Sequence, residues 1–309
     1  MREDIPIIDM HGHLGNILYP SGGLIFSEGR KFPPSRGLQF LDEKYLFRDI
    51  RLGLALNKLF PNWSVNCERA RNAAATLQNF RKSIPVDENI QLCACFPVAP
   101  NTAYEDICKA REKDPRILPF ASPDFTLGVA GMAKKLASDL LSGAAGVKIH
   151  PIIQETEADS EAVTAAVQAV ADAAKPAPVA LHTGRAYYYT PKENKARFAD
   201  YASAPKIARL VSEFPNVNFI AAHAGLAEYA LYAKLLAPYK NAYVDTSFQP
   251  PEIIRELVAA YGADRVLFGS DWPYGLRAPA IRAVSEACGG DKGLCKALFY
   301  DNAAALLGL

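Results

Sequence analysis

Two histidines separated by one glycine end the first apolar run of the chain, in the stretch PIIDMHGHLG at residues 6–15. On a β-strand, residues i and i+2 point to the same side, so His11 and His13 are expected to project together. Two neutral imidazoles that converge in this way are typical ligands of a divalent metal ion. A catalytic zinc site also needs further protein ligands and one open position.

The other three histidines also follow short apolar runs. His150 ends GVKIH, His182 ends PVALH and His223 ends FIAAH, while Asp271 follows VLFGS near the C-terminus. If each run is a strand, every histidine lies at the C-terminal end of a strand, and His182 and Asp271 can complete the ligand set. The alternative interpretation of Asp271 is a helix N-cap, a common position for aspartate.

The elements that must position these residues alternate along the chain. Eight apolar runs are the strand candidates: residues 5–11, 90–96, 116–121, 144–150, 177–182, 217–223, 242–247 and 265–271. Helix candidates lie between most of them: residues 67–84, 130–143, 159–175, 205–214 and 250–262. Strand–helix alternation predicts a parallel sheet, and eight units predict an α/β fold of the (β/α)₈ TIM-barrel type, with catalytic groups at the C-terminal strand ends. A doubly wound sheet is the alternative, but the chain lacks a glycine-rich phosphate turn after the first strand.

Two connections are too long for ordinary loops between a strand and its helix. Residues 14–62 follow the first strand, and residues 185–205 follow the fifth. In a barrel, both insertions lie on the C-terminal face, where substrate walls are built. No linker rich in Ser, Gly or Pro divides the chain, so residues 1–309 are expected to form a single domain.

The composition argues against several classes of partner. The net charge of +1, from 34 basic and 33 acidic residues, favours neither nucleic acid nor a membrane surface. The opening MREDIPIIDM lacks the apolar run of a signal peptide, and no run approaches the 18 apolar residues of a membrane span. Six cysteines without a CxxC pair are typical of reduced thiols, so we expect a cytoplasmic protein. A small-molecule substrate is the expected partner, and a homo-oligomer is left open.

The motifs together resemble the amidohydrolase superfamily, and within it the branch of TIM-barrel metal-dependent hydrolases related to aminocarboxymuconate semialdehyde decarboxylase. The matching stretches are IIDMHGHLG, GVKIHP, PVALHTG, FIAAHAG, VLFGSDWPYG and LFYDNAAALLGL, which leave the two insertions outside. The resemblance implies one divalent ion, usually zinc, held by His11, His13, His182 and Asp271. It also implies that His223 orients or protonates beside the metal-bound water.

These roles agree with the chemistry of zinc. The ion lowers the pKa of its water to around 7, and Asp271 can accept a proton from that water. His223 is the alternative acid or base, or a ligand of a second ion. Lys148 and His150 are predicted to share a face of the fourth strand, and both are candidates for substrate contact. Lys148 supports a single-metal site, binds a substrate carboxylate, or pairs with an acid in a lower layer of the barrel. In parts of the superfamily such a lysine is carboxylated and bridges two ions; we expect one ion.

Further side chains are candidates for substrate contacts. Arg185 and Arg277 follow the ligand-bearing strands, where a guanidinium can clamp a carboxylate, or they are solvated loop residues. Five aromatic residues either wall the pocket or pack the loops together; they are Tyr187, Tyr188, Tyr189, Trp272 and Tyr274.

Two reactions suit such a site. The sequence favours hydrolysis of an amide, ester or lactone of a small carboxylated substrate by metal-activated water; the alternative is non-oxidative decarboxylation of an aromatic or unsaturated acid. Asp9 favours hydrolysis, because some decarboxylases of the branch have glutamate at this position before the histidines. Asp9 is expected to face the same way as His11, one layer deeper in the barrel. A binding protein that has lost its metal is disfavoured, since unused buried imidazoles and carboxylates only cost stability.

Overall fold

The structure, a computed structural model, describes residues 5–19, 23–28, 59–186, 188–193 and 195–309. All eight predicted strands are present in the described part of the chain. They are β1 (Ile7–Gly12), β2 (Ile90–Cys95), β3 (Ile117–Pro119), β4 (Val147–Ile149), β5 (Val179–His182), β6 (Phe219–Ala222), β7 (Ala242–Asp245) and β8 (Val266–Leu267). The strands are short and mostly apolar. Apart from Gln91 and Leu92 of β2 and Tyr243 of β7, their residues are buried, which suits strands covered on both sides.

The strands run parallel and are ordered as in the chain. Strands β1–β2–β3 form one sheet and β4–β5–β6–β7–β8 form a second. Bridges join the two sheets at both edges, between Gly12 and Trp272 and between Ala121 and Val147. At the first of these edges the N–H of Met10 donates to the carbonyl oxygen of Phe268 at 2.9 Å. The predicted (β/α)₈ barrel is therefore confirmed, with all C-terminal strand ends on one face.

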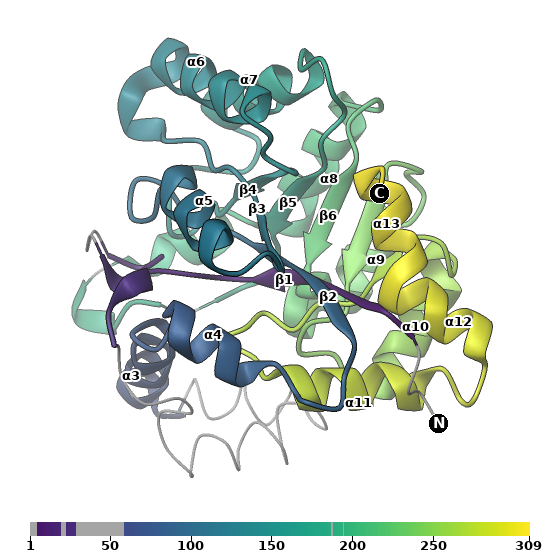
Figure 1. Cartoon of the computed structure of the whole chain (residues 1–309). Helices are drawn as coiled ribbons and strands as arrows, with labels where there is room; N and C mark the ends of the chain where they lie inside the picture. Colours follow the sequence, from purple (N-terminus) through teal and green to yellow (C-terminus); the bar gives the residue numbers. More distant parts are fainter. Residues whose placement is uncertain (1–4, 20–22, 29–58, 187, 194) are drawn as a thin grey trace.

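Helices surround the strands (Figure 1). They are α3 (Pro61–Asn72), α4 (Leu77–Ser83), α5 (Tyr104–Lys113), α6 (Gly128–Leu141), α7 (Glu161–Ala171), α8 (Ala204–Glu213), α9 (Tyr229–Leu236), α10 (Pro251–Tyr261), α11 (Arg277–Ala287), α12 (Lys292–Lys296) and α13 (Asn302–Leu307). The single helix expected over residues 67–84 is wrong, because Thr76 starts a new helix: its side chain accepts a hydrogen bond from the N–H of Asn79.

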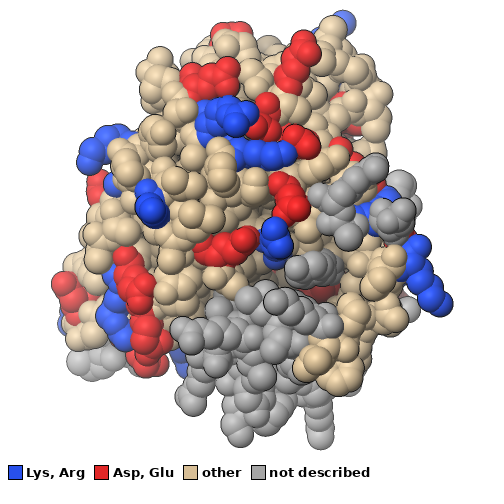
Figure 2. Space-filling view, turned by 180° about the vertical axis from the view of Figure 1, so that it is seen from behind, with Lys and Arg blue, Asp and Glu red and all other residues tan. Residues whose placement is uncertain are grey.

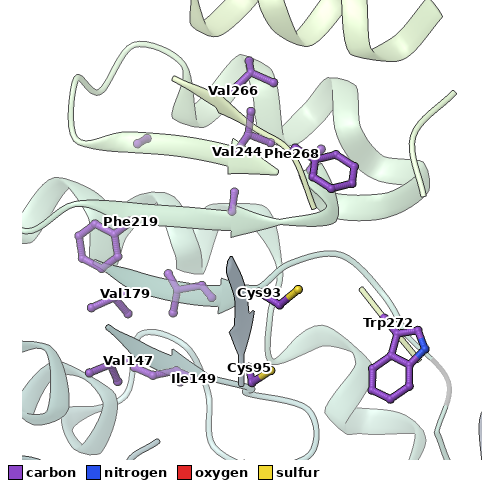
Figure 3. Close-up of a cluster of buried hydrophobic side chains, with 14 of the residues drawn as sticks. Cys93, Cys95, Val147, Ile149, Val179, Phe219, Val244, Val266, Phe268 and Trp272 are labelled. Atoms are coloured by element: carbon purple, nitrogen blue, oxygen red, sulfur yellow. The ribbon is translucent and has the colours of Figure 1, made fainter. Parts of the chain in front are cut away.

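Two apolar layers hold the barrel together. The outward side chains of neighbouring strands pack against the helices, among them Val147, Phe219 and Val244 (Figure 3). Alternate residues form a smaller cluster inside the barrel, which includes Met10 and Phe120. This two-sided burial fixes the register of each strand and so the direction of the side chains at its end.

The two predicted insertions differ in how much of them is described. After β5, two short 3₁₀ helices (Pro191–Glu193 and Ala196–Asp200) precede α8. Residues 14–62 lie largely outside the described residues; a 3₁₀ helix at Leu24–Phe26 belongs to their described part.

The described surface carries charges of both signs. Lysines and arginines are interspersed with aspartates and glutamates over the face drawn in Figure 2, in keeping with the near-zero net charge. None of the helices in the described segments combines the length and the apolar character that crossing a bilayer requires. None of the six cysteines forms a disulfide bond.

Candidate metal centre

The first strand carries its two histidines to the end of the barrel through a β-bulge. Met10 belongs to the cluster inside the barrel. The register of β1 against β2 shifts between Asp9 and Gly12, where β1 has one extra residue. Because of this residue, His11 follows Met10 on the inner side, and the ring of His13 lies 5.3 Å from that of His11.

The two imidazoles point the same ring nitrogen at one carboxylate. Nε2 of His11 and Nε2 of His13 each lie 3.4 Å from Oδ1 of Asp271. The ligand atoms of these three buried residues all lie within 4.8 Å of one another. Asp271 follows β8, and its N–H donates to the carbonyl oxygen of His11 at 2.8 Å. The seam between β8 and β1 therefore assembles this group.

Asp271 has a backbone conformation that few residue types tolerate. Its φ is +53°, in the left-handed region where aspartate is better tolerated than most non-glycine residues. Helix α11 begins at Arg277, with Leu276 as its N-cap. Asp271 is therefore not a helix N-cap, and the alternative interpretation of this residue is wrong.

The Nδ1 atoms of both histidines are held by oxygen acceptors. Nδ1 of His11 lies 2.9 Å from Oδ2 of Asp245, and Nδ1 of His13 lies 2.9 Å from the carbonyl oxygen of Phe96. Since a carboxylate and a carbonyl only accept, Nδ1 carries the proton in both rings and Nε2 presents its lone pair. Metal-binding histidines are usually supported in this way.

Several polar atoms of this centre are buried without a hydrogen-bond partner in the described part of the chain. They are Nε2 of His11, Oδ1 of Asp271, Nε2 of His182, Nδ1 of His223 and Nζ of Lys148. Buried polar atoms are rarely left unpaired in proteins. Imidazole nitrogens and a carboxylate at these separations suit a divalent first-row ion. The residues present therefore fit one ion bound by His11, His13 and Asp271.

His182, the fourth predicted ligand, lies beside this group rather than in it. Its Nδ1 is 3.1 Å from Nε2 of His223, while its Nε2 lacks a hydrogen-bond partner among the described residues. His182 thus presents one ring nitrogen to a neighbouring histidine and keeps the other unpaired.

The remaining histidines, His150, His182 and His223, form a row next to the group of His11, His13 and Asp271. The ring of His150 stacks on that of His182 with centroids 3.9 Å apart, and its Nε2 lies 3.2 Å from the hydroxyl of Tyr188. At the other end of the row, the ring of His223 stacks on His11 at 5.6 Å. All five histidines therefore lie in one cluster, as their positions at strand ends predict.

Burial sets the protonation of these groups. Removal from water lowers the pKa of four histidines well below its usual value; they are His13, His150, His182 and His223. Their rings are neutral at pH 7, the form that binds a metal. Burial also raises the pKa of Asp271 to about 6, although the charges of His11 and Lys148 oppose this rise.

Lys148 reaches the same cluster from β4. It is fully buried, and its Nζ lies 4.9 Å from the centre of the Phe96 ring, which in turn lies 5.0 Å from the ring of His11. Burial lowers the pKa of Lys148 to about 8, against the attraction of Asp271 and Asp245. An ammonium group in the barrel without a hydrogen-bonded acid, as far as the described residues show, is unusual.

Asp245 is a site residue that sequence reasoning missed. It ends β7, is fully buried, and accepts hydrogen bonds from the N–H groups of His223 at 3.0 Å and Ser247 at 2.9 Å besides that from His11. Burial would raise the pKa of Asp245, but His11 and these hydrogen bonds bring it below its usual value. A signal was present, because Asp245 ends the strand AYVD at the position where other strands carry histidines.

Asp9 and Arg277 lie behind the strand rather than in the mouth of the barrel. Oδ2 of Asp9 accepts from Nε of Arg277 at 3.0 Å, both side chains are fully buried, and the guanidinium lies 4.8 Å from the ring of Phe80. The expectation that Asp9 faces the same way as His11 is wrong, because the bulge between them reverses the alternation. Both alternatives for Arg277, a substrate clamp or a solvated loop arginine, are wrong, because its side chain is buried and paired with Asp9.

Two predicted substrate contacts lie elsewhere. Trp272 is fully buried in the outer cluster (Figure 3), with its ring 5.7 Å from that of Phe80, so it packs behind the mouth instead of lining it. The side chain of Arg185 is 54% exposed and pairs with Asp200 at 2.7 Å. The structure therefore does not bring either side chain to the histidine cluster.

Two of the tyrosines expected to wall the pocket do reach the cluster. The ring of Tyr274 lies 5.8 Å from His13, and the ring of Tyr188 lies 6.5 Å from Tyr274. Tyr189 instead contacts a lysine of its own loop. Tyr187 lies outside the described residues.

A family model described as amidohydrolase matches residues 8–309. The chain belongs to the amidohydrolase family. The match confirms the resemblance that the strand-end motifs predict. A comparison with curated proteins finds no match.

Solved structures that are similar to this chain in fold include two decarboxylases. A 5-carboxyvanillate decarboxylase from Novosphingobium aromaticivorans, solved with manganese and 3-methoxy-4-hydroxy-5-nitrobenzoic acid, is 16% identical with a TM-score of 0.68, over 99% of this amidohydrolase and 98% of that chain. A 2,6-dihydroxybenzoate decarboxylase from Rhizobium is 15% identical with a TM-score of 0.61, over 98% of both chains. An uncharacterised TIM-barrel protein from Bordetella bronchiseptica is 14% identical with a TM-score of 0.65, also over 98% of both chains. At these identities, the likeness establishes the barrel fold of the amidohydrolase.

Proposed function

We propose that this amidohydrolase-family protein is a metal-dependent decarboxylase, which removes CO₂ without oxidation from a small aromatic or unsaturated carboxylic acid. The observation that carries the proposal is the buried group of His11, His13 and Asp271, with two lone pairs and one carboxylate oxygen facing one point. The family and the decarboxylases among the structural neighbours support the reaction type.

The reaction places two demands on the protein. The bond between the carbon skeleton and the carboxylate breaks, the electron pair stays on carbon, CO₂ leaves, and a proton takes its place. The site must therefore hold an anionic substrate and supply one proton. When bound by His11, His13 and Asp271, with His182 beside them, a divalent ion supplies the positive charge that attracts the acid's oxygen atoms. One ion is proposed; zinc and manganese are the metals to test, the latter because a neighbour holds it.

Residues around this group are assigned by position. Asp271 and His223 follow different strands and both lie next to His11, so we assign proton transfer to them. The stacked rings of His150 and His182, with the hydroxyl of Tyr188, offer a flat wall for an aromatic or conjugated substrate. Lys148 adds a cation in the same space.

Hydrolysis of an amide, ester or lactone is the competing reaction. The sequence favoured it through Asp9, but Asp9 is paired with Arg277 behind the strand, so that argument no longer applies. The six cysteines form no disulfide with one another, which suits a reducing compartment, and we propose the cytoplasm as the site of action.

The proposal is tested by assaying protein reconstituted with Zn²⁺ or Mn²⁺. Hydroxybenzoates and unsaturated diacids are screened for CO₂ release in D₂O, next to a panel of lactones, esters and amides. We expect CO₂ release with one deuterium placed on the product carbon, and no release by a His11→Ala control. Turnover of the hydrolysis panel without CO₂ release from any acid would contradict the proposal.

A further inference from the structure

The carboxylate of Asp245 links the two halves of the histidine cluster. Oδ2 accepts from Nδ1 of His11 at 2.9 Å, while Oδ1 accepts from the N–H of His223 at 3.0 Å and from the N–H of Ser247 at 2.9 Å. Asp245 is fully buried. Three N–H donors on one buried carboxylate indicate a residue with a defined task rather than a surface acid.

We propose that Asp245 is a positioning residue that decides which ring nitrogen of His11 faces the metal and, through its second oxygen, holds the backbone that carries His223. The inference rests in part on the proposed metal-dependent function. Asp245 is not among the site residues predicted from the sequence, and it is not part of the ligand group of His11, His13 and Asp271.

The contact between Asp245 and Nδ1 determines the tautomer of His11. A carboxylate oxygen only accepts, so Nδ1 carries the ring proton and Nε2 keeps its lone pair. That Nε2 lies 3.4 Å from Oδ1 of Asp271 and is buried without a hydrogen-bond partner among the described residues. With the opposite tautomer, a proton would occupy the direction in which the metal binds.

The other oxygen of Asp245 holds the backbone after β6. His223 and Ala224 have φ of +43° and +54°, a left-handed conformation that non-glycine residues rarely adopt. Asp245 holds the N–H of His223, and Nε2 of Gln249 donates to its carbonyl oxygen at 2.8 Å. These two bonds fix the turn that places the His223 ring beside His182.

The neighbouring strand leaves room for this contact. A Cβ on Gly269, which follows β8, would lie 2.7 Å from Oγ of Ser247 and 3.0 Å from both Oδ1 of Asp245 and Cβ of His11. A side chain there would push Asp245 and His11 out of place, so the glycine is needed for their approach.

The test compares Asp245→Asn with Asp245→Ala. In the Asn variant, the amide oxygen accepts the hydrogen bonds from the two backbone N–H groups, so the NH₂ group faces Nδ1 of His11. The ring must then accept at Nδ1 and carry its proton on Nε2, towards the metal. In the Ala variant, the acceptor is lost but Nε2 can keep its lone pair. Loss of such a supporting residue costs roughly 10- to 100-fold in metal affinity, and we expect the Asn variant to lose more than the Ala variant.

Mn²⁺ alone is titrated into the metal-free proteins by calorimetry, with circular dichroism to verify folding. Asp139→Asn, which removes a buried carboxylate paired with Lys135 on α6, is the control and should bind Mn²⁺ like the wild type. A purely structural role predicts the opposite order, because asparagine replaces aspartate with the same shape. An Asn variant that binds Mn²⁺ as tightly as the Ala variant, or more tightly, would overturn the inference.

A second readout does not depend on the metal or on the variants' folding. Nitrogen-15 NMR of the metal-free wild type should show the His11 proton on Nδ1, and a proton on Nε2 would overturn the inference. A wild-type protein that binds no divalent ion but has the Nδ1 tautomer would contradict the proposed function and leave the role of Asp245 in orienting the ring supported.

Discussion

The five histidines fall into two groups that are held in different ways. His11 and His13 each have an oxygen acceptor on Nδ1, and their Nε2 atoms converge on Asp271. His182 and His223 instead contact each other through two ring nitrogens 3.1 Å apart, and the ring of His150 stacks on that of His182 at 3.9 Å. Nδ1 of His150 accepts from the N–H of Ile153 at 3.3 Å, so its ring proton is on Nε2. Both groups are buried, yet among the described residues only His11 and His13 have an oxygen acceptor that leaves the lone pair on Nε2.

This difference suits one group of histidines to metal binding and the other to proton transfer and substrate contact. An imidazole with a fixed tautomer is preorganised to bind a metal, since no reorientation is needed when the ion arrives. An imidazole that faces another imidazole can donate or accept, which suits proton transfer and substrate contact. We therefore assign the ion to the seam between β8 and β1. We assign proton transfer and substrate contact to the row of His150, His182 and His223, at the ends of β4, β5 and β6.

The largest effect is expected from removing a ligand of the first group. His11→Ala or His13→Ala should abolish tight metal binding and activity while the barrel stays folded, because both side chains lie at the strand ends and not in the packed layers. Elemental analysis and a thermal melt of each variant check this. Near-stoichiometric metal in either variant would remove that histidine from the ligand set.

The next test sets one residue of each group against the other. Asp271→Asn should weaken metal binding and turnover together, because we propose that this carboxylate both holds the ion and takes part in proton transfer. His223→Asn should keep the metal but lose a factor of about 10² in kcat, the scale expected for a general acid or base. Metal content and kcat are measured side by side. A His223→Asn protein that loses its metal would move His223 into the ligand set and favour two ions.

A smaller effect is expected from Lys148→Met. If Lys148 supports a single site, metal content stays near one ion per chain and the variant is at least as stable as the wild type, because an unpaired buried charge is replaced by an apolar side chain. If a carboxylated Lys148 bridged two ions, the wild type would hold about two ions, roughly 3.5–4 Å apart, and the variant would lose one. Metal titration and a melting curve distinguish the cases.

The smallest effect is expected from Arg185→Ala. Its side chain is 54% exposed and paired with Asp200, so the change should alter stability by less than about 0.5 kcal/mol and leave KM nearly unchanged. Steady-state kinetics check this. A large rise in KM would return Arg185 to the substrate-binding residues.

The sequence predicted the barrel and the gathering of the histidines because both depend on local patterns. Short buried runs such as AYVD and FIAA define the strands, and parallel order then places every strand end on one face. His11, His13 and Asp271 follow from this rule without knowledge of any contact.

The failed predictions depend on features that no local pattern contains. The bulge in β1 reverses which residues face inward, so Asp9 could not be placed by counting from His11. Trp272 directly follows Asp271, whose φ is positive, and its indole lies in the outer apolar layer. Asp245 acquires its role only through a contact with His11, 234 residues away in the chain.

The central claim is that one ion binds at the seam between β8 and β1. A crystal structure of the protein grown with Mn²⁺ or Zn²⁺, with anomalous diffraction measured at the metal's absorption edge, tests it directly. We expect one anomalous peak per chain, about 2.0–2.2 Å from Nε2 of His11, Nε2 of His13 and a carboxylate oxygen of Asp271. A single peak among His150, His182 and His223, with none beside Asp271, would contradict it.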